Sequence, residues 1–256
     1  MKIDIRTDVA KYYDYNTDFP NDISFYRKLI PSTKAAVLEL GCGTGRVLIP
    51  LSHHCSFSYG IDISRAMISI CRNKIKKANI PLVKARIKKG DITNFNLHME
   101  FDLIIAPFRV LQNLETDEEV NGMFNCIHRH LAPGGTCILN VFKPNRDPNG
   151  LRNNWVCNEE FFDWEVPLKN GKLTCHNRRA RMDIEKLILY PELIYRRYEV
   201  DTIKEVVVLK PTMRCYYPDT FEKLIRDHGF SINNRWGGYD GETYGFGPEL
   251  IIQFKN

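Results

Sequence analysis

The sequence predicts an α/β fold in which helices alternate with the strands of a mostly parallel, doubly wound sheet. Short apolar runs alternate with helical patterns from residue 35 to residue 142. A glycine-rich loop stands directly after the first apolar run. Beyond residue 143 the pattern changes to period-two stretches typical of antiparallel strands. We therefore expect an α/β unit with an antiparallel β insertion before its C-terminal helix.

The composition is that of an ordinary globular protein, and it favours neither a membrane nor a nucleic-acid partner. The chain has 256 residues, of which 43% are hydrophobic and 26% are charged, and its net charge is +5. This length fits one large domain or one domain with an insertion. The densest basic clusters, at residues 74–77 and 84–89, alternate with apolar residues, which favours a solvated face over a nucleic-acid groove. No apolar stretch approaches the length of a membrane span.

The eight cysteines are scattered singly along the chain. No C-x-x-C pair occurs, so neither a zinc ribbon nor a redox dithiol is expected, and no metal is predicted. Cys71, Cys126 and Cys137 stand in apolar patterns, where free cysteine behaves as a small hydrophobe. The first residues lack the apolar segment of an export signal. Together these features favour a reducing, cytoplasmic location.

Local signals define the elements of the α/β part. Residues 7–30 show a helical pattern, with Asp22 as the expected N-cap of its second half. Ser64 caps a later helix, and Thr116 opens another through a capping box with Glu119. The helix after the glycine loop is expected over residues 46–53. The expected strands are 35–40, 57–62, 83–89, 101–106 and 137–142.

The last part of the chain contains the insertion and the return to the sheet. Residues 144–154 are expected to form a loop, and Asn170-Gly171 is a hairpin turn signal. Asp219 is the expected N-cap of the C-terminal helix, which ends near Gly229. The final strands are expected at 231–236 and 250–254. The predicted division is a main unit of residues 1–145 and 216–256 and an insertion of residues 146–215.

The spacing of the glycines in the loop distinguishes between different kinds of nucleotide-binding site. Glycines let bare backbone approach a ligand, and the following helix directs its first N–H groups at an anionic group. A dinucleotide fingerprint would need glycine at position 46, where the chain has Arg46, and the phosphate-binding G-x-x-x-x-G-K-[ST] is absent. What remains is E-x-G-x-G-x-G, starting at Glu39. An ordinary strand-to-helix turn is the alternative.

Acidic residues stand at the ends of the next two expected strands. Asp62 lies about twenty positions beyond the glycine loop, where a carboxylate can accept hydrogen bonds from both hydroxyls of a ribose. Asp91 ends the following strand. Both side chains are therefore expected at the ligand-binding edge of the sheet, although each could instead cap the element that follows it.

The glycine loop, Asp62 in GIDIS, Asp91 in GDI, the stretch FDLIIAPF and the turn LAPGG occur in one order. Together they resemble the motif series of class I S-adenosylmethionine (SAM) methyltransferases over residues 35–142. The resemblance implies a Rossmann-like, seven-stranded sheet with SAM as methyl donor and S-adenosylhomocysteine as product. The wider layout, with Tyr13-Asp14 upstream and the β insertion, resembles small-molecule enzymes such as glycine, sarcosine and amino-sugar N-methyltransferases.

The resemblance implies cofactor contacts for residues of the loop and the strand ends. Those expected at the methionine end of SAM are Glu39, Gly41, Cys42, Gly43 and Gly45. Those expected at its ribose and adenine are Asp62, Ile63, Met67, Asp91 and Ile92. Phe108 and Arg109 would lie where the sulfur meets the acceptor, and Tyr13 would close over the cofactor. Tyr13 and Arg109 are the candidate catalytic residues.

Purely structural roles stay open as alternatives. Met67 and Ile92 could be core residues, Tyr13 part of an amphipathic helix, and Arg109 the partner of an acidic side chain.

The leading hypothesis is methyl transfer to the nitrogen or oxygen of a small molecule, with the insertion covering the acceptor or forming a homodimer contact. The candidate acceptor-side residues are Trp155, Trp164, Tyr195, Arg214 and Tyr216. His176 and His228 are candidate bases, but neither is assigned. The alternatives are an RNA or protein methyltransferase and a non-catalytic SAM-binding protein on the same fold.

Overall fold

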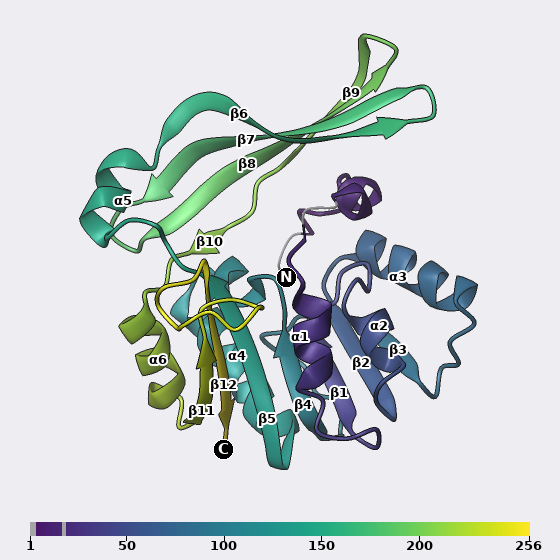
Figure 1. The fold of residues 1–256 in the computed structure, drawn as a ribbon, viewed down its shortest axis with the longest axis vertical. Helices are drawn as coiled ribbons and strands as arrows, with labels where there is room; N and C mark the ends of the chain where they lie inside the picture. The colour runs from purple at the N-terminus through teal and green to yellow at the C-terminus, as the bar shows by residue number, and fades with distance from the viewer. Residues whose placement is uncertain (1–3, 17–18) are drawn as a thin grey trace.

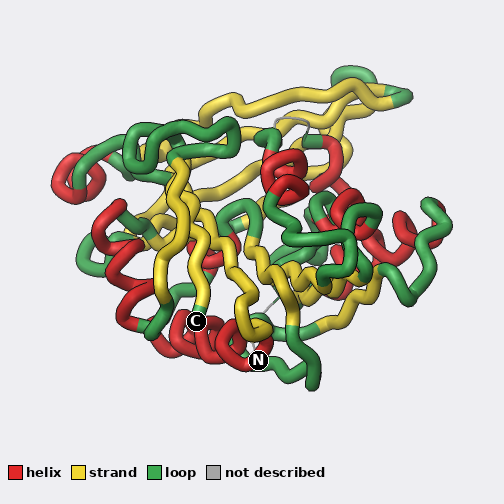
Figure 2. Tube along the Cα trace, turned by 60° about the horizontal axis from the view of Figure 1, so that its bottom comes forward, coloured by secondary structure: helices red, strands yellow, loops and turns green. Residues whose placement is uncertain are grey.

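The computed structural model describes residues 4–16 and 19–256, which form two β-sheets (Figure 1). The larger sheet has seven strands in the order β11-β12-β5-β4-β1-β2-β3, with helices on both faces (Figures 1 and 2). A five-stranded antiparallel sheet lies across one end of it (Figure 1). The predicted fold, a seven-stranded, mostly parallel α/β sheet with an antiparallel β insertion before the C-terminal helix, is confirmed.

The strands of the larger sheet are β1 (Ala36–Leu40), β2 (Phe57–Asp62), β3 (Ala85–Lys89), β4 (Phe101–Ala106), β5 (Leu131–Phe142), β11 (Ser231–Trp236) and β12 (Glu249–Lys255). The helices are η1 (Ala10–Tyr15), α1 (Asp22–Lys28), α2 (Leu48–Ser52), α3 (Arg65–Lys77), η2 (Val110–Asn113), α4 (Asp117–His130), α5 (Pro148–Asn154) and α6 (Pro218–Asp227). Within the described ranges, none of the helices is long and apolar enough to span a membrane.

The strand order reverses beside β1. Strands β1 to β5 pair in parallel, whereas β12 pairs antiparallel with both β5 and β11. From β1 the chain moves outward to β2 and β3 and then returns to β4 on the other side of β1. Open α/β sheets bind their ligands at the carboxyl ends of strands at such a reversal. The glycine loop that follows β1 lies at this position.

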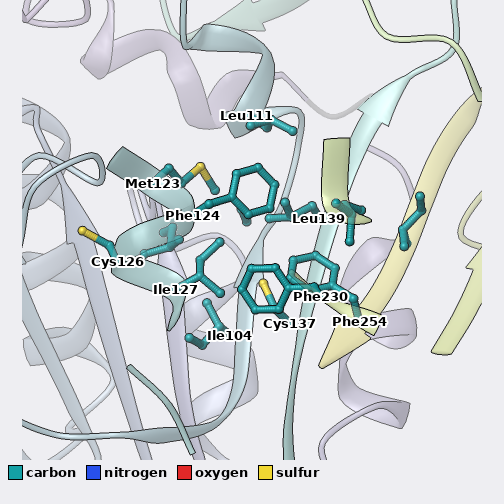
Figure 3. Packing of buried hydrophobic residues seen from close by; sticks show 14 of the residues in the cluster. Ile104, Leu111, Met123, Phe124, Cys126, Ile127, Cys137, Leu139, Phe230 and Phe254 are labelled. Carbon is teal, nitrogen blue, oxygen red and sulfur yellow. The ribbon is translucent and has the colours of Figure 1, made fainter. Parts of the chain in front are cut away.

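Alternation along the strands separates two apolar layers. On β1, Val37 packs with side chains of α1 and α2, and Leu38 faces the opposite layer. That layer holds α4 and α6 against the sheet, with Phe124, Leu139 and Phe254 among its buried residues (Figure 3). Strands covered on both faces are continuously apolar, which explains the uninterrupted runs in the sequence.

The smaller sheet is built from β6 (Cys157–Leu168), β7 (Gly171–Asp183), β8 (Ile188–Glu199), β9 (Thr202–Leu209) and β10 (Met213–Arg214). The predicted hairpin turn at Asn170-Gly171 joins β6 and β7. A Cβ at Gly171 would lie 2.2 Å from the carbonyl oxygen of Tyr198, so the close approach of β8 requires glycine there.

The structure corrects two predictions about helix starts. Asp22 is not an N-cap: it is the first residue of α1, is fully buried and pairs with Arg46. Asp219 is not an N-cap either, because α6 begins one residue earlier at Pro218, whose missing N–H suits the first helical position.

One further segment differs from its predicted structure. In the predicted helical region of residues 7–30, the described residues form the two short helices η1 and α1, as expected from a second helix start near Asp22. The prediction of a loop at residues 144–154 was wrong, because α5 occupies Pro148–Asn154. The side chain of Asp147 accepts a hydrogen bond from the N–H of Gly150 and caps this helix.

Candidate active site

A cavity of about 480 Å³ lies between the carboxyl ends of the parallel strands and the smaller sheet. Its walls combine residues of the glycine loop, the ends of β2 and β4, the N-terminal segment and the strands β7 and β8. The predicted site residues on these walls are Tyr13, Glu39, Gly41, Cys42, Gly43, Asp62, Ile63, Met67, Asp91, Ile92, Phe108 and Arg109.

The glycine loop owes its shape to three left-handed residues. Gly41, Gly43 and Gly45 have φ of +70°, +52° and +80°. A Cβ at Gly41 would lie 2.7 Å from Val110, and nothing lies within 4 Å of one at Gly43, which faces the cavity. Gly45 is the exception among the predicted cofactor residues, because it does not line the cavity. A Cβ there would lie 2.3 Å from the sulfur of Cys71 on α3.

Asp62 ties the loop to the end of β2. Its Oδ2 accepts a hydrogen bond of 2.8 Å from the N–H of Gly43, and its Oδ1 accepts one of 2.8 Å from the N–H of Ser64. Burial raises the pKa of this carboxyl, and the two backbone hydrogen bonds counteract that effect. The carboxylate is thus held in a defined orientation on the cavity wall.

The next strand end supplies a second carboxylate. Oδ1 of Asp91 accepts hydrogen bonds from the N–H and the hydroxyl of Thr93, at 2.9 and 2.7 Å. The apolar side chains of Met67 and Ile92 line the wall nearby, and Met67 is almost completely buried. This side of the cavity therefore offers an apolar surface edged by carboxylates.

A buried ion pair stands behind the loop. Arg46 donates two hydrogen bonds, of 2.7 and 2.6 Å, to the carboxylate of Asp22. Its guanidinium lies 4.3 Å from the ring centre of Phe19 and 5.5 Å from that of Phe108. Glu39 faces the same region with a buried Oε2 that has no hydrogen-bond partner among the described residues. Burial raises the pKa of this carboxyl well above its ordinary value.

The turn after β4 carries backbone strain. Phe108 and Arg109 have φ of +54° and +68°, backbone angles that residues other than glycine rarely adopt. The N–H of Arg109 donates to Asn140, and its guanidinium pairs with Glu249 at 2.6 Å. Asn140 also donates to Glu249. Such strain persists where surrounding contacts hold it, and it is concentrated at functional sites.

The N-terminal segment closes the cavity between the two sheets. Asp14 accepts a hydrogen bond from Thr44 of the glycine loop at 2.7 Å and pairs with Lys74 of α3 at 2.7 Å. On the other side, the ring of Tyr12 stacks on Tyr195 of β8. The wall residue Tyr13 packs against Phe19, with ring centres 5.5 Å apart. The segment therefore links the loop to the smaller sheet.

The candidate acceptor-side residues do not all come together. Tyr195 lines the cavity, and Trp164 lines an adjoining one. Trp155 packs in a separate apolar cluster, Arg214 pairs with Asp117, and Tyr216 belongs to the main core. His176 and His228 do not line either cavity.

Several residues that line the cavity were not predicted from the sequence, namely Arg6, Asn16, Phe19, Asp163 and Asn177. The one local signal was in the stretch Phe161-Phe162-Asp163-Trp164, where the apolar and polar residues do not alternate.

Residues 37–135 match the family model described as a methyltransferase domain. This match confirms the predicted resemblance to SAM-dependent methyltransferases of the small-molecule type. A curated relative, the dTDP-3-amino-3,4,6-trideoxy-alpha-D-glucopyranose N,N-dimethyltransferase of Streptomyces venezuelae, is 24% identical over 143 residues. The alignment covers 56% of this chain and 56% of that relative, so the chain spans about half the length of the curated relatives it matches.

Solved structures share the whole fold. A SAM-dependent methyltransferase from Clostridium acetobutylicum has a TM-score of 0.77 at 17% identity, over 98% of this chain and 99% of that one. A SAM-bound amino pentose methyltransferase from Micromonospora echinaspora has a TM-score of 0.71 at 18% identity, over 100% and 99%. At these identities the similarity establishes the architecture, including the smaller sheet.

The packing around Gly45 predicts that Gly45→Ala destabilises the protein more than the left-handed backbone angle alone would. Gly45→Ala should combine the cost of a left-handed alanine, about 1–2 kcal/mol, with a clash against Cys71 that adds about 1 kcal/mol or more. Gly229→Ala is the matched control, because its φ is +83° and nothing lies within 4 Å of a Cβ. Urea unfolding measures both, and equal losses would contradict the packing argument.

The burial of Glu39 predicts a pH-dependent stability. In the unfolded chain this carboxyl ionises near pH 4.5, whereas the folded protein keeps it protonated to higher pH. The wild type therefore loses stability relative to Glu39→Gln as the pH rises above 4.5, by up to about 1.4 kcal/mol per unit until the folded pKa is reached. Urea unfolding of both ligand-free proteins from pH 4 to 8 checks this, and a constant difference would refute it.

Proposed function

We propose that this chain is a SAM-dependent methyltransferase that transfers a methyl group to a small molecule. The observation that carries the proposal is the joint placement of the left-handed glycine loop and Asp62 on one cavity wall, with the loop's own N–H group fixing the carboxylate. The methyltransferase domain at residues 37–135 supports it. Relatives named as amino-sugar N,N-dimethyltransferases support a small acceptor that carries an amine.

The wall residues fit SAM by their chemistry. Gly41 and Gly43 would admit the methionine end close to bare backbone. The buried Oε2 of Glu39, which has no hydrogen-bond partner within the described part of the chain, would receive its ammonium. Asp62 would accept the ribose hydroxyls. Asp91, beside apolar Met67 and Ile92, would accept the exocyclic amine of adenine. Gly45 would act indirectly, by letting α3 pack against the loop.

The chemical task of the residues is alignment. Bound SAM would supply a methyl group already activated by its positive sulfur. The strained turn at Phe108 and Arg109 forms one wall where acceptor and cofactor would meet, and Tyr13 forms another. Holding two reactants in line and excluding water can contribute about 7–11 kcal/mol in favourable cases. Tyr13 and Arg109 would therefore position the reactants, and Arg109 is itself held by Glu249.

The smaller sheet supports a second part of the proposal. We infer that residues 146–215 form a unit inserted into the methyltransferase unit of residues 1–145 and 216–256, and that two copies of the chain meet through it. Phe162, Val206 and Val208 lie on one face of this sheet and are 64, 52 and 40% exposed. Exposed apolar patches of this kind mark association surfaces.

The cytoplasmic location stays a prediction, in keeping with eight free cysteines.

The cofactor proposal is tested by calorimetric titration with SAM and S-adenosylhomocysteine. The wild type should bind both, and Asp62→Asn should bind at least about tenfold more weakly, because a hydrogen bond to a charged group is lost. Asp219→Asn, an exposed substitution on α6, should bind normally. Thermal melting confirms that the variants are folded. Absence of binding to the wild type at high micromolar concentration, or unchanged affinity of Asp62→Asn, would overturn the proposal.

The dimer proposal is tested by sedimentation velocity. The wild type should sediment as a dimer, and Val206→Asp should sediment as a monomer because the substitution places a charge in the apolar contact. Val83→Asp, at a valine that is 70% exposed on the larger unit, should remain dimeric. A monomeric wild type at micromolar concentration would contradict the proposal.

A further inference from the structure

One wall of the first cavity comes from the smaller sheet, which lies over the carboxyl ends of the parallel strands (Figure 1). The residues proposed to hold SAM belong to the larger unit, on the glycine loop and around the ends of β2 and β3. The smaller sheet is therefore left to contact the acceptor. The side chains that it turns to the cavity specify the kind of acceptor that fits.

Every second residue of β8 points into the cavity. Pro191, Leu193 and Tyr195 line it, as expected because alternate residues of a strand share a face. Glu192, which stands between the first two, pairs with Lys210 at 2.9 Å. The alternation of β8 therefore turns apolar and aromatic side chains to the cavity and places this charged residue on the opposite face.

The segment from the end of β9 to β10 repeats the pattern. Leu209, Pro211 and Met213 line the cavity, again at every second position. Leu209 pairs with Leu193, and Met213 pairs with Leu189, so the two segments form neighbouring apolar rows on one face of the sheet. Leu193 and Met213 are only partly buried, which leaves their apolar surface open to the cavity.

A buried glutamine holds β10 beside the strained turn. The Nε2 of Gln112, on η2, donates a hydrogen bond of 2.9 Å to the carbonyl oxygen of Arg214, and its Oε1 accepts one of 2.8 Å from the N–H of Phe142. The Gln112 side chain is completely buried. Because η2 begins directly after Arg109, this contact places the apolar rows next to the turn where acceptor and cofactor would meet.

Asn177 adds an amide to the apolar rows. It pairs with Leu193 across β7 and β8 and lines the cavity with it. An amide side chain can both donate and accept hydrogen bonds. The wall therefore offers hydrogen bonds to one polar substituent beside a larger apolar surface.

A carboxylate reaches the cavity through a β-bulge in β6. Phe162 pairs with His176 and Trp164 pairs with Cys175, so Asp163 is an extra residue in the ladder. Bulges of this kind re-aim side chains beside active sites. Asp163 lines the cavity, but it already takes part in another interaction within the chain and is not a free group for the acceptor.

The positive charge on the cavity comes from other elements. Arg6 of the N-terminal segment donates to the side-chain oxygen of Asn113 and keeps its charge, whereas Arg46 and Arg109 are held in ion pairs. An anionic group on a distant part of the acceptor is therefore compatible with the cavity. The smaller sheet determines only the part of the acceptor that lies against it.

A ring with many hydroxyl groups would fit this wall poorly. A hydroxyl that leaves water for an apolar surface loses hydrogen bonds, and the single amide of Asn177 can replace only a few of them. A hydrocarbon body has no such loss, and its burial against the wall removes apolar surface from water.

We propose that the methyl acceptor has an aliphatic or aromatic body, which the two apolar rows of the smaller sheet hold, and that Asn177 binds one polar substituent on it. This inference rests on the proposed function and specifies its substrate class. Leu193 and Met213 are the specificity-determining residues, because they present the accessible apolar surface beside the strained turn.

The experiment uses the full chain with S-adenosylhomocysteine bound and two amines that share a six-membered ring. Cyclohexylamine has a hydrocarbon ring, whereas the ring of glucosamine carries hydroxyl groups. Calorimetry compares the two at concentrations up to the millimolar range. Cyclohexylamine should bind at least about tenfold more tightly, since each methylene group that is buried contributes about fourfold.

Two variants place an amide in the apolar rows with little change in size, Leu193→Asn and Met213→Gln. Each should bind cyclohexylamine about tenfold more weakly, because apolar contacts worth about fourfold per methylene group are lost. Ile203→Asn is the matched control, because Ile203 lies on β9 of the same sheet, is 47% exposed and lines neither cavity. It should bind cyclohexylamine as the wild type does.

Equal or tighter binding of glucosamine, no binding of cyclohexylamine at millimolar concentration, or unchanged cyclohexylamine affinity in the two wall variants would overturn the inference. Thermal melting and a wild-type affinity for S-adenosylhomocysteine confirm that a variant is folded. The two levels of the proposal fail differently. Without affinity of the wild type for S-adenosylhomocysteine the proposed function itself fails, whereas normal affinity without preference for the hydrocarbon ring defeats only the acceptor class.

Discussion

The buried pair of Arg46 and Asp22 is the contact on which the rest of the site depends. It joins α1, which precedes the first strand, to the glycine loop, which follows it. The Asp22 side chain is completely buried, and the loss of one partner from such a pair destabilises a protein by about 3–5 kcal/mol. Because Arg46 is engaged by Asp22 and two aromatic rings, the neighbouring Glu39 keeps a carboxylate oxygen that has no hydrogen-bond partner among the described residues.

The sequence predicted the elements whose signals are local. The glycine spacing, the strand-end Asp62 and Asp91, and the capping box at Thr116 each depend on a few adjacent residues, and the structure places them as expected. The role of Asp22 was misjudged for the same reason. Asparagine and aspartate before a helical pattern favour an N-cap, but the partner that decided its position is 24 residues away.

Other parts of the site depend on contacts between distant segments. Arg109 is held by Glu249, 140 residues later in the chain, and the sequence alone left this pairing as one alternative among others. The exposure of Asp163 to the cavity depends on the register between β6 and β7, which becomes defined only when the two strands pair. Side-chain pattern specifies register weakly where neither face of a strand is fully buried.

Because of the bulge at Asp163, sequence changes in β6 can alter the smaller sheet while the larger sheet stays unchanged. Loss of that one residue would restore regular alternation in β6 and turn part of the strand's side chains to the other face, while the seven-stranded sheet would keep every hydrogen bond. Single-residue insertions and deletions at this edge strand can therefore reshape the wall of the adjoining cavity without any cost to the half of the molecule that carries the glycine loop. Within such a lineage, the loop after β1 would stay constant while β6 changed.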